Sequence, residues 1–103
     1  MGISRKSALE CVGPGWSRLI NDLYDKKPKN CIVVQVKEKY GTLRFYADNI
    51  DENYLNLIVR AEEESAHICE QCGEPGEVEP LFGWYLCLCE KCHKERLLER
   101  LNG

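Results

Sequence analysis

The chain has 103 residues, of which 44% are hydrophobic and 30% charged, so its composition predicts one compact globular domain and excludes a disordered chain. The formal net charge of −3 disfavours a protein that binds nucleic acid by non-specific attraction to phosphates. The sequence has no apolar leader and no apolar run long enough to span a bilayer, so we expect a cytoplasmic protein with no membrane partner.

The first predicted element is an amphipathic helix that begins after the Gly-Pro-Gly break at 13–15. Apolar residues recur there with the spacing of one helix face, at Trp16, Leu19, Ile20, Leu23 and Tyr24. Pro28 ends this helix, because the residue before a proline is biased out of the helical conformation. We treat the residues before Gly13 as a polar lead-in.

A β-hairpin is predicted next. Residues 31–38 and 42–47 are rich in strand-forming residues, and Gly41 between them supplies the positive φ of a tight turn. We expect a loop of two or four residues, because an even length puts the apolar side chains of both strands on one face. These apolar residues are Val34, Val36, Leu43 and Phe45, and the other face carries Gln35, Lys37, Thr42, Arg44 and Tyr46.

A second helix is predicted over about residues 51–67, with Asp48, Asn49 or Asp51 as its N-cap. Its inward stripe consists of Tyr54, Leu57, Ile58, Ala61, Ser65 and Ile68. We assign Glu62, Glu63 and Glu64 to its solvated side. Because no Ser/Gly-rich linker follows, we expect the cysteine-containing segment to dock rigidly on the preceding unit.

Two C-x2-C pairs, Cys69/Cys72 and Cys89/Cys92, are separated by sixteen residues, which is a spacing typical of structural zinc sites. Two intervening residues let both sulfurs of a pair converge on one ion. We therefore predict one structural Zn²⁺ held by these four cysteines. The odd total of seven cysteines, with no export signal, argues against disulfides, because the cytosol keeps thiols reduced.

Residues 76–80 and 84–88 predict a short hairpin with its bend at Phe82-Gly83, which makes the segment between the cysteine pairs a zinc ribbon. A segment of about 35 residues buries too little apolar area to fold alone. Zinc supplies roughly 10–16 kcal/mol of apparent binding free energy in finger-type sites. A last helix over His93–Leu101 is expected to turn Leu97, Leu98 and Leu101 toward the body.

Other interpretations of the metal site stay open on the sequence alone. Tetrahedral sulfur also suits iron. Cys87 or His93 could replace one predicted ligand, and His67 also flanks the site. We expect Cys11 and Cys31 to be small buried hydrophobic residues.

No catalytic motif accompanies the cysteines. Four thiolates leave a zinc ion no open position for water, and the sequence has no Gly-rich phosphate loop, nucleophile elbow or H-E-x-x-H run. We therefore expect a binding protein and not an enzyme.

Two candidate binding surfaces follow. One is a cluster of cations and tyrosines on the first hairpin, consisting of Lys37, Lys39, Tyr40, Arg44 and Tyr46. It could contact a protein, or bind nucleic acid or a nucleotide by phosphate contacts and stacking, or be an ordinary solvated sheet face. The second is a set of aromatic anchors for a protein partner at Phe82, Trp84 and Tyr85, unless Trp84 packs the ribbon onto the second helix.

Several of these motifs together resemble a set of small phage and prophage proteins of no assigned activity. The resemblance covers about residues 15–92 and rests on Gly15-Trp16, VKEKYGTLRFY at 36–46, CEQCGEPG at 69–76 and Gly83-Trp84 through Cys89. It implies action in the cytoplasm of a bacterial host cell on a host protein, including proteins of host defence. The chain departs from this set by ending in Cys92-His93 and a charged helix.

The sequence thus predicts an α+β fold in two parts. Residues 1–67 form an α+β unit of helix, β-hairpin and helix. Residues 68–103 form a zinc ribbon with a short C-terminal helix, and we expect the two parts to pack together as one compact domain.

Overall fold

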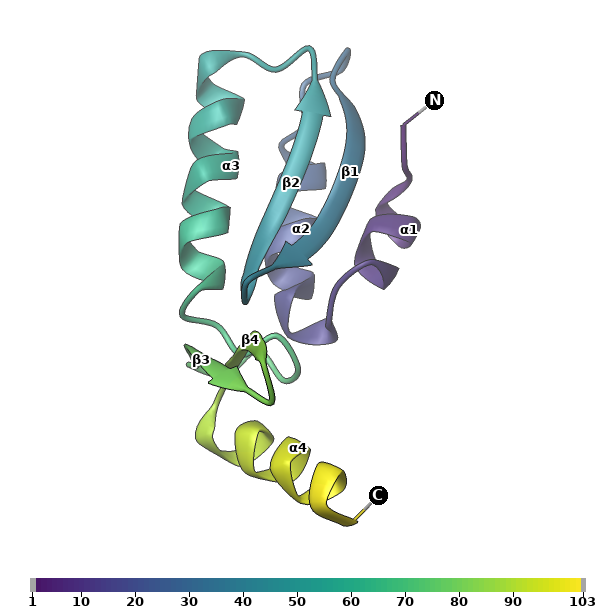
Figure 1. The fold of residues 1–103 in the computed structure, drawn as a ribbon. Helices are drawn as coiled ribbons and strands as arrows, with labels where there is room; N and C mark the ends of the chain where they lie inside the picture. The colour runs from purple at the N-terminus through teal and green to yellow at the C-terminus, as the bar shows by residue number, and fades with distance from the viewer. Residues whose placement is uncertain (1, 103) are drawn as a thin grey trace.

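Helices and two antiparallel hairpins make up the computed structural model, which describes residues 2–102 (Figure 1). The elements are α1 (Arg5–Glu10), the 3-10 turn η1 (Pro14–Trp16), α2 (Ser17–Asp25), β1 (Ile32–Lys39), β2 (Thr42–Asp48), α3 (Glu52–Ser65), β3 (Glu77–Leu81), β4 (Trp84–Leu88) and α4 (Glu90–Asn102). The predicted α+β fold class is confirmed.

The core of the first unit lies between the hairpin β1–β2 and the helices α2 and α3. Figure 1 shows α2 behind the hairpin, α3 beside β2 and α1 beside β1. The predicted stripes supply the buried side chains, which are Leu19, Ile20 and Leu23 of α2 and Tyr54, Ile58, Ala61 and Ser65 of α3. Asp51 caps α3 by accepting a hydrogen bond of 2.7 Å from the backbone N–H of Tyr54.

The turn of the first hairpin has two residues, Tyr40 and Gly41, both with positive φ, so the predicted even loop is confirmed. The prediction that Val34 faces the core is wrong. The register shifts between Val33 and Gln35, and this bulge resets the alternation of side chains, so that Val33 is buried and Val34 is exposed.

Side chains of α3 cover the free edge of β2. The backbone N–H of Leu43 donates to Ser65 Oγ at 2.8 Å, and that of Phe45 donates to Glu62 Oε2 at 2.9 Å. These contacts satisfy two donors that would otherwise be ready to pair with another strand. The assignment of Glu62 to the solvated side is therefore wrong.

The short helix α1 was not predicted. Ser4 caps it by accepting a hydrogen bond of 3.1 Å from the backbone N–H of Ser7, and Ala8 is buried against the core. Cys31 is buried, as predicted, but Cys11 is not. Cys11 ends α1 at the surface, where its thiol donates to the carbonyl oxygen of Ser7.

The second hairpin and the cysteine loops on either side of it, residues 68–92, are called the ribbon below. Its two faces bury different residues. Val78 and Cys87 face the core of the first unit, whereas Leu81 and Leu88 face α4 and contact Leu97. The ribbon therefore lies between the first unit and α4 (Figure 1).

Helix α4 projects from one end of an elongated molecule with extents of 48 × 23 × 20 Å. Of the three leucines that we expected to face the body, Leu97 does so, but Leu98 and Leu101 are exposed. The prediction for these two is wrong because the helix rests on the ribbon alone and its last turns extend past it. No helix within residues 2–102 is long and apolar enough to cross a membrane.

Candidate metal centre

The first cysteine pair is placed by the turn that follows α3. The backbone N–H of Cys69 donates to the carbonyl oxygen of Glu74 at 2.7 Å, and that of Gly73 donates to the carbonyl oxygen of Cys69 at 2.9 Å. Gly73 has a φ of 85°, which a residue with a side chain adopts only with strain. This tight loop brings Cys72 back beside Cys69.

The second pair is placed by the junction of β4 and α4. Cys89 follows β4, and Cys92 lies in the first turn of α4. The backbone N–H of Cys92 points at Cys89 Sγ, 3.3 Å away, and the backbone N–H of His93 donates to the carbonyl oxygen of Cys89 at 2.9 Å. A backbone donor aimed at sulfur stabilises a thiolate.

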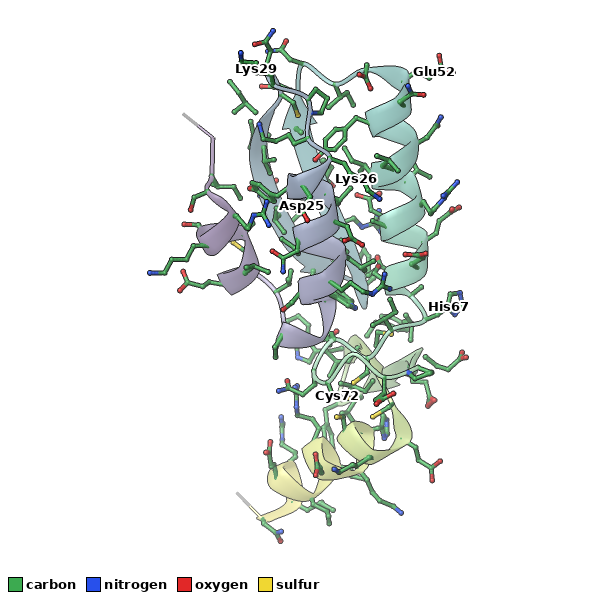
Figure 2. The ribbon with its side chains drawn as sticks, turned by 180° about the vertical axis from the view of Figure 1, so that it is seen from behind. Asp25, Lys26, Lys29, Glu52, His67 and Cys72 are labelled. Carbon is green, nitrogen blue, oxygen red and sulfur yellow. The ribbon has the colours of Figure 1, made fainter. Side chains whose placement is uncertain are left out.

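The side chains of all four predicted cysteines lie close together. The Sγ atoms of Cys69, Cys72, Cys89 and Cys92 lie within 4.8 Å of one another, close enough to hold a metal ion. Cys69 and Cys92 are buried, whereas Cys72 is exposed. Figure 2 labels Cys72 at the ribbon, next to the start of α4.

The thiols of this cluster differ in acidity. Burial raises the pKa of Cys69, but backbone N–H groups of Cys89, Cys72 and Gln71 outweigh it and lower the pKa to about 7. Burial and hydrogen bonds with the other three thiols raise the pKa of Cys92. The charge of the Cys69 thiolate makes a further, smaller contribution to this rise, and a bound cation would remove that repulsion.

The alternative ligands lie outside this group. Cys87 is buried in β4 and its thiol donates to the carbonyl oxygen of Ile68 at 3.1 Å. Burial raises the pKa of Cys87 to about 11, so it stays a protonated hydrophobic residue. His67 is exposed and points away from Cys72 in Figure 2. His93 Nε2 is buried without a hydrogen-bond partner among the described residues.

The sequence did not show which residues support the cluster from outside. The loop at Gly13–Trp16 lies directly on the first cysteine pair, where the backbone N–H of Gly15 donates to the carbonyl oxygen of Glu70 at 2.8 Å. A Cβ at Gly15 would overlap the carbonyl oxygen of Cys69 and lie 2.7 Å from the nitrogen of Gly73. The Gly-Pro-Gly break therefore supports the cysteine cluster as well as starting the helix.

Glu70 is a second supporting residue that the sequence did not indicate. Its backbone N–H donates to the carbonyl oxygen of Cys87 at 2.9 Å, and its Oε2 accepts from the backbone N–H of Cys87 at 3.3 Å. Burial is the main cause that raises its pKa. Glu70 thus ties the first cysteine loop to β4.

The predicted binding residues of the first hairpin divide into two groups. Lys37 and Arg44 are direct cross-strand partners, and Lys37 Nζ lies 5.8 Å from the ring centroid of Tyr46. Tyr40, beside Lys39 at the turn, instead makes an edge contact with Tyr85 of the ribbon.

The tip itself packs against the ribbon. A Cβ at Gly41 would come within 2.9 Å of Val78 Cγ1, and Glu38 Oε2 accepts a hydrogen bond of 2.7 Å from the backbone N–H of Gly41. Part of the motif at 36–46 is thus explained by docking between the two parts of the molecule.

The aromatic anchors predicted on the ribbon are exposed. Trp84 is 73% exposed, and Phe82 and Tyr85 are about half exposed. Trp84 lies on the face of the ribbon that is turned toward α4, so it does not pack the ribbon onto α3.

Comparison of the chain with protein-family models, with curated proteins and with solved structures finds no match.

Proposed function

We propose that this protein is a non-enzymatic binding protein, whose ribbon is held by one structural zinc ion and whose first hairpin carries the binding surface. The binding surface is the outer hairpin face, which consists of Gln35, Lys37, Thr42, Arg44 and Tyr46.

The identity of the metal is supported by the donor set. Zn–S bonds of about 2.3 Å in a tetrahedron imply sulfur–sulfur edges of about 3.8 Å. The Sγ atoms of Cys72 and Cys89 are 3.7 Å apart. Four cysteine donors would complete the coordination of zinc, which favours a structural ion without an open position for substrate. Iron would accept the same donors, and elemental analysis of the purified protein distinguishes the two.

The single observation that carries the binding proposal is the pair Lys37 and Arg44. These cations lie directly opposite each other on adjacent strands, an arrangement that destabilises a hairpin. Within residues 2–102 neither makes an ion pair, and Arg44 Nε is buried without a hydrogen-bond partner. An acidic group of a partner would relieve both the repulsion and the unmet donor.

A bacterial protein is the partner that we favour, in keeping with the resemblance to small phage proteins that act in the host cytoplasm. An acidic protein surface would satisfy Lys37 and Arg44, and Tyr46 beside them would add an aromatic contact. A nucleic acid or nucleotide is the second candidate, because the same cations would bind phosphate and Tyr46 would stack on a base.

The test is capture of partners from bacterial lysate with a Lys37→Ala/Arg44→Ala variant, with and without nuclease. The matched control is Lys26→Ala/Lys29→Ala, which removes two positive charges from the segment that follows α2. Figure 2, which views the molecule from the side opposite to Figure 1, labels both lysines. We expect the hairpin variant to lose the partner and the control to keep it. A captured polypeptide that is retained after nuclease identifies a protein partner, and unchanged capture by the hairpin variant would discard the proposal.

A further inference from the structure

A second surface lies on the other side of the ribbon, between its hairpin and α4. It is a groove of about 450 Å³, called the ribbon groove here. Its lining combines apolar and charged side chains, which are Leu81, Phe82, Trp84, Leu86, Arg96, Glu99 and Arg100. Neither the metal cluster nor the outer hairpin face contributes a residue to it.

The groove exposes more aromatic surface than the packing of the ribbon on α4 requires. Leu81 is buried and Leu86 is partly buried in the small core shared by the ribbon and α4. Trp84, the cross-strand partner of Leu81, leaves most of its surface in water, and Phe82 at the turn is about half exposed. Adjacent exposed aromatic residues in a concave site are a common feature of protein-binding surfaces.

The charged wall of the groove is cationic in character. Arg96 and Arg100 are four residues apart on α4 and therefore share one face of the helix. The guanidinium carbon of Arg100 lies 4.9 Å from the ring centroid of Phe82, which holds this cation over the floor. Within residues 2–102 neither arginine makes an ion pair, so both keep free donors for an anionic group.

We propose that the ribbon groove binds a short acidic peptide segment of a partner protein, with an aromatic or large aliphatic side chain as its anchor. The anchor would lie on Phe82 and Trp84, and flanking carboxylates would face Arg96 and Arg100. The volume of the groove suits an anchor residue and its neighbours.

The charges around the groove favour a peptide over a nucleic acid. Residues 68–103 carry seven glutamates and four lysines or arginines, so the surroundings repel a long polyanion, with one charge on every nucleotide, more strongly than a short peptide with a few carboxylates. Glu99 in the lining repels the terminal phosphate dianion of a mononucleotide more strongly than it repels a single carboxylate. A peptide needs only local complementarity to two arginines.

The test is titration of the full chain with a panel of synthetic pentapeptides whose central residue is flanked by Asp and Glu. The central residue is Phe, Leu or Trp in the probes and Ser in one control, and a second control has Lys in place of the acids. AMP and a short oligo(dT) form the nucleotide arm. Chemical shifts of the two tryptophan indole N–H groups report the site, because Trp84 lines the groove and Trp16 is buried elsewhere.

We expect the anchored acidic peptides to shift the indole signal of Trp84 and leave that of Trp16 unchanged. Arg96→Ala/Arg100→Ala should weaken their affinity at least about tenfold. The matched control is Lys91→Ala/Lys94→Ala, which removes the same charge from α4 while Lys94 lies in a different hollow, and it should bind normally.

Three outcomes would overturn the proposal: no acidic peptide shifts Trp84, the Lys-flanked peptide binds equally well, or nucleotides bind more tightly. The Lys37→Ala/Arg44→Ala variant should bind the peptides as the unchanged chain does. The experiments therefore distinguish a failure of the proposal for the ribbon groove from a failure of the proposal for the outer hairpin face.

Discussion

The indole Nε1–H of Trp16 donates a hydrogen bond of 2.9 Å to the carbonyl oxygen of Ile68, the residue before the first cysteine of the four-cysteine cluster. The same oxygen accepts the thiol of Cys87 at 3.1 Å. One carbonyl group, in the segment that follows α3, therefore accepts hydrogen bonds both from Trp16 at the start of α2 and from Cys87 of β4. Because Trp16 and Ile68 are buried or partly buried, this junction couples the core of the first unit to the position of Cys69.

We expect Trp16→Phe to lower the free energy of unfolding by about 2–4 kcal/mol. The change removes the hydrogen bond to Ile68 and leaves a cavity in the core. Urea denaturation followed by circular dichroism measures the effect. Trp84→Phe is the matched control and should change stability by no more than about 0.5 kcal/mol, because Trp84 is exposed. Equal effects of the two variants would show that Trp16 has no special part in the docking.

Gly15→Ala tests the contact between the loop and the first cysteine pair. The added Cβ meets backbone atoms of Cys69 and Gly73, which cannot move without shifting the cysteine loop. We expect a loss of about 2–3 kcal/mol of stability and a measurable loss of metal affinity in a chelator competition.

Gly83→Ala provides the comparison for Gly15→Ala. Its φ is also positive, at 87°, but its Cβ would meet no atom within 4 Å. It should therefore cost only about 1 kcal/mol of strain and leave metal affinity unchanged. Unchanged metal affinity in Gly15→Ala would separate this loop from the site.

Local patterns predicted much of the fold and the cysteine cluster. The stripes of α2 and α3 and the two C-x2-C pairs depend on residues a few positions apart, so spacing alone indicated them. The sequence did not indicate the bulge at Val34, because the alternation of apolar residues does not distinguish which of two adjacent valines faces the core. The docking of Gly15 on Cys69 did not show either, because it joins residues far apart in the chain.

The motif at 36–46 illustrates the same limit. From the sequence its cations and tyrosines looked like one binding tip. In the structure Gly41 is buried against Val78, and Tyr40 contacts Tyr85 at its edge but stays 65% exposed, so only part of the tip docks on the ribbon. Lys37 and Arg44 are not explained by that interface, and they are the residues that the binding proposal retains.

Removal of the proposed zinc ion should unfold the ribbon before the first unit. Chelation, or Cys69→Ser, takes away the link between the two cysteine pairs. We expect the remaining apolar contacts, which are the small core of Leu81 and Leu88 and the packing of Val78 and Cys87 on the first unit, to be too few to hold the segment. We expect amide protons of β3, β4 and α4 to lose exchange protection while α2 and α3 keep theirs.

Cys11→Ser is the control for metal removal, because this thiol is exposed and lies outside the cluster. It should leave both metal content and exchange protection unchanged. Protein that is purified free of metal and is still fully protected in β3 and β4 would contradict the structural role of the ion.

Ser65→Ala should destabilise the first unit through the edge of β2. Ser65 Oγ accepts from the buried backbone N–H of Leu43 at 2.8 Å, and alanine leaves that donor without a partner. The expected loss is about 1–3 kcal/mol of unfolding free energy, measured in urea. Ser7→Ala changes an exposed serine of α1 and should have little effect, so similar losses in the two variants would contradict the role assigned to Ser65.

Tyr54 makes stability sensitive to alkaline pH. Its hydroxyl donates to the carbonyl oxygen of Leu23 at 2.7 Å, and burial, with smaller contributions from Cys31 and Tyr24, raises its pKa above the ordinary value of 10.0. Because the pKa is higher in the folded than in the unfolded chain, this stabilisation is complete below pH 10 and is lost as the pH rises toward the folded value.

We therefore expect the free energy of unfolding to fall above pH 10, and to fall less steeply in Tyr54→Phe. The variant should also be about 1 kcal/mol less stable at neutral pH, because the carbonyl of Leu23 loses its donor. Tyr24 and Cys31 have raised pKa values of their own, so some alkaline sensitivity should persist. Urea titrations at neutral pH and above pH 10 measure both effects, and identical alkaline slopes for the two proteins would rule out Tyr54 as a source.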